Sequence, residues 1–384
     1  MNTSFAFLDY LIFVVYAIVI LGVGLWVSRD KDGKDKTAED YFLASKSLPW
    51  WAIGASLIAA NISAEQFIGM SGSGFALGLA IASYEWMAAI TLLIVGKYFL
   101  PIFIEKGLYT IPEFVEKRFS TNLKTILAVF WIALYVFVNL ASVMYLGGLA
   151  IETIIGIDMV YAVIGLALFA AAYSLYGGLS AVAWTDIIQV VFLVLGGVVT
   201  TYLALDTVSQ GEGVIEGLKT IYAAAPDRFE MILDRNNPEY NNLPGIGVLV
   251  GGLWVANLYY WGFNQYIIQR TLAAKSLKES QKGILFAAGL KLIIPFIVVI
   301  PGIAAYVIVN DPEILASLGS SGSANMPSVG SADKAYPWLM QFLPTGFKGI
   351  AFAALTAAIV SSLASMLNST STIFTMDIYK QFIN

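Results

Sequence analysis

The chain has 384 residues, of which 58% are hydrophobic and 12% are charged, and its formal net charge is −5. Soluble domains carry about 25% charged residues, so this composition excludes a water-exposed globular protein and favours membrane spans of about 20 apolar residues each. The sequence contains no Cys and no His, which excludes thiol nucleophiles, Ser-His-Asp triads and metal sites built from thiolate or imidazole. The negative net charge argues against nucleic acid as a partner.

Nine apolar segments are predicted to span the membrane. The first follows an uncharged start and lacks a small-residue cleavage site, so it is predicted as a permanent span and not as a signal peptide. Two polar stretches, 206–244 and 310–346, are predicted to be loops outside the bilayer. The predicted spans are 8–27, 50–72, 76–104, 125–150, 159–177, 183–205, 245–267, 283–309 and 347–375.

The distribution of Lys and Arg predicts the orientation of the chain, because cytoplasmic loops are enriched in both. If the loop after the first span is cytoplasmic, the basic residues of 97–124 and 268–282, including Arg270, lie on the same side. Most of the 21 Lys and Arg residues are then inside. We therefore expect the amino terminus outside and the carboxyl terminus in the cytoplasm.

Four charged residues fall within predicted spans, namely Glu65, Glu85, Asp186 and Lys291. Charges at such positions are rare and usually mark a functional site. For Glu85 and Lys291, which long apolar runs flank, we favour function over a structural ion pair or a snorkelling side chain. For Asp186, which lies near the end of its span, the structural and the functional interpretation are both open.

The second predicted span is a poor membrane helix. Its sequence SLIAANISAEQFIGMSGSG would bury several polar side chains against hydrocarbon, which is energetically costly. The sequence therefore predicts an interrupted helix, in which freed carbonyls can bind a cation and polar side chains can line a cavity. The alternative is a polar contact between helices that pack through small residues. The polar residues of this span are Asn61, Ser63, Glu65, Gln66 and Ser71.

The seventh predicted span has a related pattern. Its sequence GVLVGGLWVANLYYWGFNQY places Asn257, Asn264 and Gln265 around the aromatic run 259–261. Aromatic rings next to amides suit a sugar, because its C–H face packs on a ring while its hydroxyls need hydrogen-bond partners. The alternative is an aromatic belt at the membrane interface, although these rings lie in the middle of the span.

The last predicted span is rich in hydroxyl groups. Ser361 and Ser362 are adjacent, and Ser365 follows one turn later. Hydroxyl and carbonyl oxygens are hard ligands that suit a cation such as Na⁺. Composition alone favours the alternative, in which each hydroxyl bonds to a carbonyl of its own helix.

The two interrupted spans predict an internal repeat. They lie five spans apart, and an odd separation gives the second copy the opposite orientation, as in transporters with inverted repeats. The predicted organisation is an extra first helix with a cytoplasmic loop (1–49), a five-helix repeat (50–205), an extracellular loop (206–244) and the first three helices of the inverted second repeat (245–384).

Seven stretches spread over nearly the whole chain are distinctive, namely DYFLASKSLPWW, SLIAANISAEQFIGMSGSG, IASYEWMAAITL, YTIPEFVEKRF, YGGLSAVAWTDIIQV, LWVANLYYWGFNQYIIQRTLAAKS and AAIVSSLASMLNS. They resemble the solute:sodium symporter family, most closely its bacterial sodium/galactose symporters. The resemblance implies an all-α membrane protein with the five-plus-five inverted-repeat fold, whose second repeat is expected to be incomplete because the family continues with further helices. It also implies sodium-coupled symport of a monosaccharide of the galactose or glucose type in the bacterial inner membrane, with Na⁺ co-transported and no organic cofactor. No bond is broken in such transport, so no enzymatic activity is expected.

The resemblance implies roles for individual residues and reverses the interpretation of the serines. The implied Na⁺ ligands are the carbonyls of Ala59, Ile62 and Ala358 and the hydroxyls of Ser361 and Ser362. The implied sugar contacts are Gln66, Glu85, Asn257 and Lys291, with Asn61 close by. Tyr260 matches the ring that closes the sugar off from the cytoplasm, Met70 and Tyr84 match the outer gate, and Asp186 matches a position on the sodium exit route.

One departure from the family pattern leaves the sugar open. Ala88 stands where the family's galactose symporters have a serine that contacts the sugar. The alternatives are a sodium symporter for another small solute, such as proline or a carboxylate, and a truncated membrane module that does not transport. A channel is a further alternative.

Overall fold

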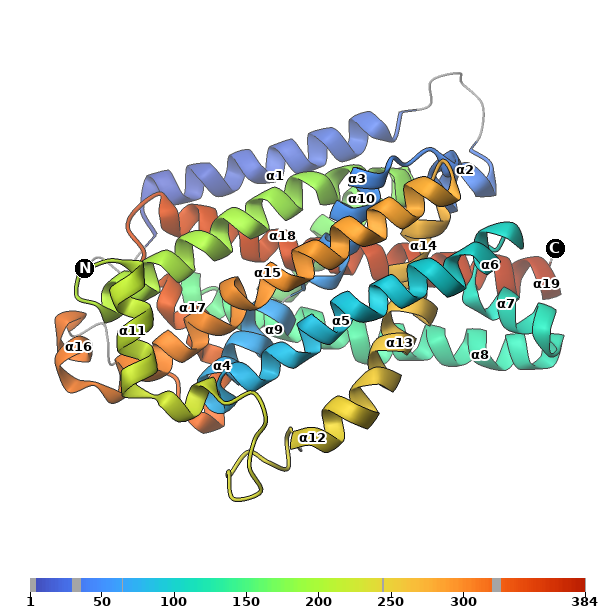
Figure 1. The fold of residues 1–384 in the computed structure, drawn as a ribbon. Coiled ribbons are helices and arrows are strands. Elements are labelled where there is room, and N and C mark those ends of the chain that lie inside the picture. Colours follow the sequence, from blue (N-terminus) through green and yellow to red (C-terminus); the bar gives the residue numbers. More distant parts are fainter. Residues whose placement is uncertain (1–4, 30–35, 64, 244, 320–325, 384) are drawn as a thin grey trace.

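The computed structural model describes residues 5–29, 36–63, 65–243, 245–319 and 326–383, and every regular element within these ranges is a helix (Figure 1). The helices form an elongated bundle, and the chain begins near one end of it and finishes near the other (Figure 1). Leu48 and Ala274 form an isolated parallel β-bridge. This bridge links the segment before the helix that starts at Trp50 to the segment after the helix that ends at Leu272.

The structure contains many α-helices, and π-helical segments join several of them into longer rods. These segments are Val95–Phe99, Tyr135–Asn139, Val248–Gly252 and Phe374–Tyr379, and a further one, Glu65–Met70, precedes α4. The α-helices are α1 (Phe7–Val27), α2 (Ala38–Phe42), α3 (Trp50–Asn61), α4 (Ser71–Leu77), α5 (Ser83–Ile94), α6 (Leu100–Glu105), α7 (Ile111–Arg118), α8 (Thr121–Leu134), α9 (Leu140–Ile155), α10 (Met159–Val208), α11 (Val214–Ala224), α12 (Gly245–Gly247), α13 (Leu253–Phe263), α14 (Gln265–Leu272), α15 (Leu277–Asn310), α16 (Pro312–Ser317), α17 (Ala335–Met340), α18 (Phe347–Ile373) and α19 (Lys380–Phe382).

Within the described residues, seven helical segments are long and apolar enough to cross a membrane. The sequence predicts nine, and the remaining two are also helical but shorter. The span predicted over 50–72 is divided between α3 and α4, and the span predicted over 159–177 corresponds to the apolar helix Met159–Ala172. The seven long segments are Phe7–Val27, Leu79–Glu105, Thr121–Ile155, Ser174–Val208, Gly245–Phe263, Leu277–Asn310 and Phe347–Phe382.

Helix α10 covers two predicted spans and bends between them at Gly178. The backbone of Gly178 has φ 56° and ψ −150°, a combination that residues with a Cβ rarely adopt. A Cβ at this position would also lie 2.3 Å from the carbonyl oxygen of Tyr41. Carbonyls released at the bend accept hydrogen bonds from side chains: the Tyr41 hydroxyl donates to Leu175 and the Lys36 ammonium to Tyr176.

The centre of the bundle is formed by α15, which packs against α3, α4 and α5, and by α18, which lies along α10 (Figure 1). Small residues permit these close crossings. The closest approach is at Gly302 of α15, where a Cβ would lie 1.9 Å from the carbonyl oxygen of Ser71 in α4. Helix α1 packs on α10 and α18 at one side of this core.

The two polar stretches contain helices, so their prediction as simple loops is wrong in part. The first holds α11, and the second holds α16 and α17. The first stretch also docks onto the bundle through Arg228, which donates to the carbonyl of Ala76 and lies 4.0 Å from the centre of the Tyr306 ring. Gly78, with φ +83°, leaves room for this contact because a Cβ there would overlap the Arg228 backbone.

Candidate functional site

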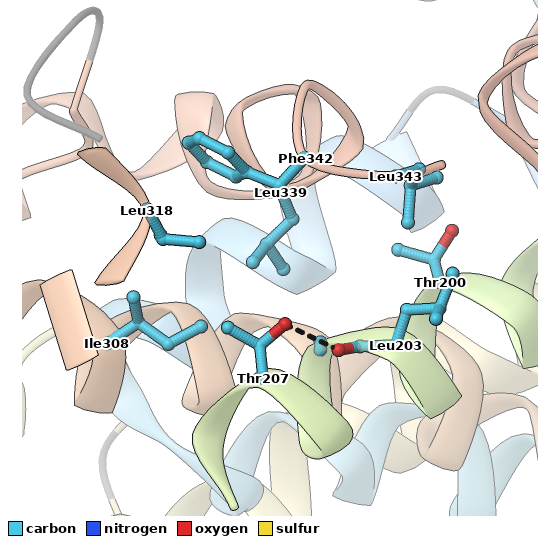
Figure 2. Close-up of a pocket in the computed structure, with 9 residues that line it drawn as sticks. Thr200, Leu203, Thr207, Ile308, Leu318, Leu339, Phe342 and Leu343 are labelled. Atoms are coloured by element: carbon cyan, nitrogen blue, oxygen red, sulfur yellow. Dashed lines mark hydrogen bonds between the residues drawn. The ribbon is translucent and has the colours of Figure 1, made fainter. Parts of the chain in front are cut away.

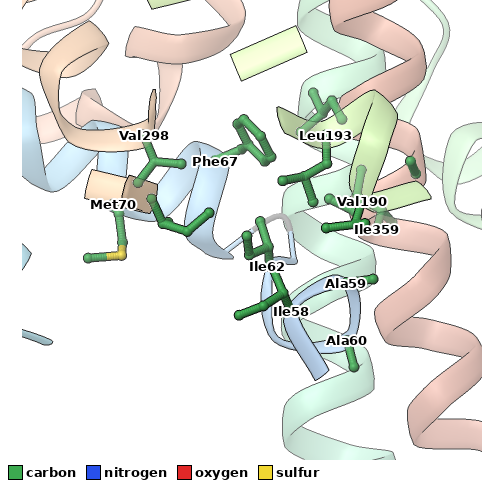
Figure 3. Close-up of a cluster of buried hydrophobic side chains, with 14 of the residues drawn as sticks. Ile58, Ala59, Ala60, Ile62, Phe67, Met70, Val190, Leu193, Val298 and Ile359 are labelled. Carbon is green, nitrogen blue, oxygen red and sulfur yellow. The ribbon is translucent and has the colours of Figure 1, made fainter. Parts of the chain in front are cut away.

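The second predicted span is an interrupted helix, as the sequence predicts. Helix α3 ends at Asn61, Ile62 has an extended backbone with φ −79° and ψ 90°, and a π-helical turn starts at Glu65. Figure 3 shows apolar side chains on both sides of the gap, with Ile58 before it and Phe67 after it. The two half-helices are therefore packed into the core while the backbone between them leaves the helical path.

Two backbone carbonyls at this interruption do not receive the bonds that a continuous helix would give them. The N–H of Ser63 donates to the carbonyl of Asn61, and the N–H of Gln66 donates to that of Ser63. The i+4 amides that would satisfy Ala59 and Ile62 are therefore directed elsewhere. Carbonyls of this kind are suitable ligands for a hard cation.

Helix α18 brings hydroxyl groups to the same region. The Ser362 hydroxyl donates to the carbonyl of Ala60 at 3.0 Å, and the Ser361 hydroxyl donates to Asp186 Oδ1 at 2.5 Å. Both bonds go to other helices, so back-bonding within α18 does not explain these two serines. Ser365 does donate to a carbonyl of its own helix, that of Ser361. Ala358, whose carbonyl belongs to the predicted site, is fully buried on the same helix.

A second polar cluster lies between α3, α5, α13 and α15. The Lys291 ammonium donates to both Glu85 Oε2 and Asn61 Oδ1, and the Asn61 amide donates to the Tyr260 hydroxyl at 3.0 Å. The Lys291 Nζ also lies 5.2 Å from the centre of the Trp261 ring. The side chain of Lys291 is 0% exposed and that of Glu85 is 4% exposed. The tertiary structure thus joins four predicted residues that are far apart in the sequence.

Two other predicted sugar contacts are not hydrogen-bonded to this cluster. The Gln66 Oε1 atom is buried and has no hydrogen-bond partner among the described residues. The Asn257 amide donates to the carbonyl of Leu253 in its own helix at 3.1 Å. Of the predicted gate residues, Met70 is buried, whereas Tyr84 is 40% exposed. Ala88 is buried and offers no side-chain hydrogen bond.

Asp186 lies in a buried ion pair that links four helices. Its carboxylate accepts hydrogen bonds from Ser361 and from Ser56, and Arg270 Nη2 lies 3.4 Å from Oδ2. Asp186 and Arg270 are both 0% exposed. The assignment of Arg270 to a cytoplasmic loop is therefore wrong: α14 continues the interrupted seventh span and buries this side chain. A count of basic residues cannot distinguish a loop arginine from one that has a buried partner.

A sequence profile described as the Sodium:solute symporter family matches residues 41–384. The chain belongs to this family. A Vibrio parahaemolyticus protein named "Sodium/glucose cotransporter" is 72% identical over 379 residues, which cover 99% of this chain and 70% of that protein. A Homo sapiens protein named "Sodium/myo-inositol cotransporter 2" is 37% identical over 394 residues, which cover 97% of this chain and 56% of that protein. The chain thus spans a little over half to about two thirds of these curated relatives.

The fold of this symporter-family chain also matches a solved structure. The matching structure is described as the substrate-bound outward-open state of a Na⁺-coupled sialic acid symporter, with a TM-score of 0.84 and 27% sequence identity. The match covers 99% of this chain and 76% of that chain. The all-α inverted-repeat fold implied by the sequence is therefore confirmed, and the chain is a multi-pass membrane protein.

At the second interruption in this symporter-family chain, the predicted gate residue Tyr260 is bonded to Tyr266, which the sequence pattern did not single out. Helix α13 ends at Phe263, Asn264 has an extended backbone with φ −83° and ψ 118°, and α14 starts at Gln265. The hydroxyl of Tyr266 lies 2.8 Å from that of Tyr260, so the aromatic side chains on the two sides of the break are hydrogen-bonded. Tyr266 follows the polar residues Asn264 and Gln265 that the sequence pattern singles out in this span, and that position was the available signal.

A small cavity of about 20 Å³ lies away from both polar clusters, between α10, α15 and α17 (Figure 2). It is lined mainly by aliphatic side chains, among them Leu203, Ile308 and Leu339. The hydroxyl of Thr207 points toward it but donates to the carbonyl of Leu203 at 2.8 Å (Figure 2). Such a volume holds no more than a water molecule, so this cavity is not the solute site of the symporter family.

Proposed function

We propose that this chain binds Na⁺ and a monosaccharide and moves both across the membrane in the same direction by alternating access. The observation that carries the proposal is the position of Asn61. It ends the first half-helix of one interruption, and its side chain contacts both Lys291 and Tyr260. The same interruption offers carbonyls to a cation, so one element serves both solutes. The name of the Vibrio parahaemolyticus relative agrees with this assignment.

The proposed Na⁺ ligands are the oxygen atoms around the first interruption. They are the carbonyls of Ala59, Ile62 and Ala358 and the hydroxyls of Ser361 and Ser362. The Ser362 bond to the Ala60 carbonyl holds α18 beside this interruption. One elementary charge that crosses a potential of 100 mV releases about 2.3 kcal/mol, and this energy can drive sugar accumulation.

The proposed sugar contacts are Gln66, Glu85, Asn257 and Lys291, with Asn61 beside them. In this structure Lys291 donates hydrogen bonds to both Glu85 and Asn61. A bound monosaccharide would replace part of this network, since hydroxyl groups both donate to carboxylates and accept from ammonium groups. The buried Gln66 Oε1 without a partner among the described residues is a further acceptor for a sugar hydroxyl.

The proposed gates are formed by Tyr260, which belongs to this cluster, and by Met70 and Tyr84. Tyr260 closes the sugar off from the cytoplasm, and Met70 and Tyr84 close it from the outside. Asp186 lies on the path by which sodium leaves. The same proposal places the chain in a bacterial inner membrane with its amino terminus outside, and retains the division into 1–49, 50–205, 206–244 and 245–384.

The test is uptake into proteoliposomes that contain the purified chain and an inward sodium gradient. We expect uptake of labelled galactose or glucose that stops when K⁺ replaces Na⁺, and little uptake of labelled proline. Uptake of proline without either sugar would reject the sugar assignment. Sodium-dependent sugar binding without uptake would instead identify a binding module that does not transport, and ionic currents far above carrier turnover would identify a channel.

Myo-inositol is a second candidate solute because it presents a ring of hydroxyl groups similar to that of a sugar. Several relatives at 36–37% identity are named for myo-inositol, and Ala88 lacks the hydroxyl expected of a galactose site. Competition for galactose uptake by unlabelled glucose and myo-inositol measures the preference. A stronger effect of myo-inositol would favour the cyclitol.

A further inference from the structure

We propose that Arg270 is a positioning residue that sets the affinity of the Na⁺ site, because it neutralises the carboxylate that orients the Ser361 hydroxyl. The inference rests on the proposed function, since it takes Ser361 as a ligand of the transported ion. It assigns a role to a residue that the sequence pattern places in a loop and that has no place among the proposed ligands.

The first observation is the direction of the hydrogen bond that the Ser361 hydroxyl makes. Ser361 donates to Asp186 Oδ1 at 2.5 Å. A hydroxyl that donates its only proton to a carboxylate directs its lone pairs elsewhere, so its oxygen remains available to a cation. Asp186 thus acts on the ion through Ser361, by holding the hydroxyl in the orientation that a ligand requires.

The second observation is that Arg270 contacts the same carboxylate. Its Nη2 lies 3.4 Å from Asp186 Oδ2. Its Nε donates to the Ser56 hydroxyl at 2.6 Å, and this hydroxyl in turn donates to Asp186 Oδ2 at 2.5 Å. The guanidinium therefore acts on Asp186 both directly and through Ser56.

Two further bonds fix the guanidinium in place. Arg270 donates to the Ser365 hydroxyl of α18 and to the carbonyl of Tyr266 in α14. The donors thus reach α3, α10 and α18 from α14, and the whole group is 0% exposed. A planar group with several donors in fixed directions suits such a site, whereas an ammonium would satisfy fewer of these acceptors.

The positive charge of Arg270 affects how strongly the proposed site attracts Na⁺. A buried carboxylate without a counter-charge would attract Na⁺ strongly and slow its release. A permanently bound guanidinium lowers this attraction but leaves the hydrogen bond that orients Ser361 intact. Arg270 donates to the backbone carbonyl of Tyr266, and the hydroxyl of Tyr266 is bonded to that of Tyr260. Arg270 therefore connects the proposed sodium site with the proposed sugar gate.

The test compares the sodium affinity of charge variants of the purified chain in detergent, measured by sodium-dependent tryptophan fluorescence and by ²²Na⁺ binding. We expect Arg270→Gln to lower the half-saturating Na⁺ concentration by about tenfold, a typical coupling between sites. Asp186→Asn should raise it by a similar factor. The double variant Arg270→Gln/Asp186→Asn should return toward the unchanged chain because both charges are removed.

Two controls separate this role from a structural one. Lys282→Gln removes an exposed positive charge from the start of α15 and should leave sodium affinity unchanged, since its side chain is 48% exposed. Monodispersity and the melting temperature report whether each variant folds. If Arg270→Gln fails to fold, the test is carried by Asp186→Asn and Arg270→Lys/Asp186→Asn, each compared with the neutral double variant.

In those comparisons, both variants that keep a positive charge at position 270 should bind Na⁺ more weakly than the neutral double variant. Weaker or equal sodium binding by folded Arg270→Gln overturns the inference, as does a double variant that binds Na⁺ no better than Asp186→Asn. If the unchanged chain binds no Na⁺, this inference and the sodium part of the proposed function both fail. If it binds Na⁺ but the charge variants do not shift the affinity, only the inference about Arg270 fails.

Discussion

The hydroxyl of Tyr135 lies 3.0 Å from the backbone nitrogen of Gln265 and accepts its hydrogen bond. The same hydroxyl donates to Asn264 Oδ1 at 2.7 Å. One side chain from the π-helical segment after α8 therefore satisfies two polar groups at the point where the second interrupted helix breaks. Tyr135 is 0% exposed, so water cannot replace it there.

Replacing Tyr135 by Phe should destabilise the chain. The substitution leaves the buried Gln265 N–H without its partner, which costs about 1–3 kcal/mol. We expect a lower melting temperature of the purified chain in detergent. Tyr145→Phe is the matched control, because Tyr145 is 54% exposed on the helix that follows. An equal effect of the two substitutions would show that the hydroxyl of Tyr135 does not support the break.

Replacing Gly302 by Ala should disrupt the crossing of α15 and α4. The added Cβ would lie 1.9 Å from the Ser71 carbonyl oxygen, and overpacking of this kind costs about 1–3 kcal/mol or more. Gly289→Ala is the control in the same helix, since nothing lies within 4 Å of its Cβ position. It should be neutral or stabilise by about 0.5–1 kcal/mol. Melting temperatures of the two variants in detergent measure the difference, and similar values would contradict the crossing.

Replacing Lys291 alone by Met should be strongly destabilising, because it leaves the Glu85 carboxylate buried without its counter-charge. Removal of one partner of a buried pair costs about 3–5 kcal/mol. The double variant Lys291→Met/Glu85→Gln should recover most of this loss, since no charge remains. Thermal unfolding compares the single and the double variant. Sugar binding should be lost in both of them. A double variant that is no more stable than Lys291→Met would mean that the pair does not determine the stability of this cluster.

Replacing Gln265 by Ala should loosen the segment before α7 from α14. The Gln265 amide donates to the Tyr109 carbonyl and accepts from the Ile111 N–H, each at 2.9 Å. Loss of two bonds worth about 1 kcal/mol each should raise the open population by roughly tenfold or more. Because the chain has no Cys, a single Leu108→Cys substitution can report this opening through its rate of maleimide modification.

The control for this labelling experiment is Gln281→Ala. The Gln281 amide also donates to a backbone carbonyl, that of Gly96 at 2.9 Å, but in a different part of the bundle. It should leave the labelling rate of Leu108→Cys unchanged. Equal rates for Gln265→Ala and for the unchanged reporter would show that Gln265 does not hold the segment.

The sequence was sufficient to predict most of the membrane-spanning helices and that the second and the seventh predicted spans are interrupted. Apolar length predicts a span because hydrocarbon tolerates few polar groups, and the polar residues of 61–66 violate that rule locally. The breaks at Ile62 and Asn264 confirm the interpretation. The same local rule could not assign 206–244 and 310–346 correctly, because short helices there are stabilised by docking onto the bundle and not by their own hydropathy.

The tertiary structure alone decided which polar groups meet. Glu85 and Lys291 are 206 residues apart, and their bond depends on how α5 crosses α15. Arg270 looks like a loop residue in the sequence, yet it is buried against Asp186 because α14 turns inward after Asn264. Hydropathy measures the cost of placing each side chain in lipid, whereas the cost of a buried charge depends on its partners. These partners come from other helices, so only the packed structure specifies them.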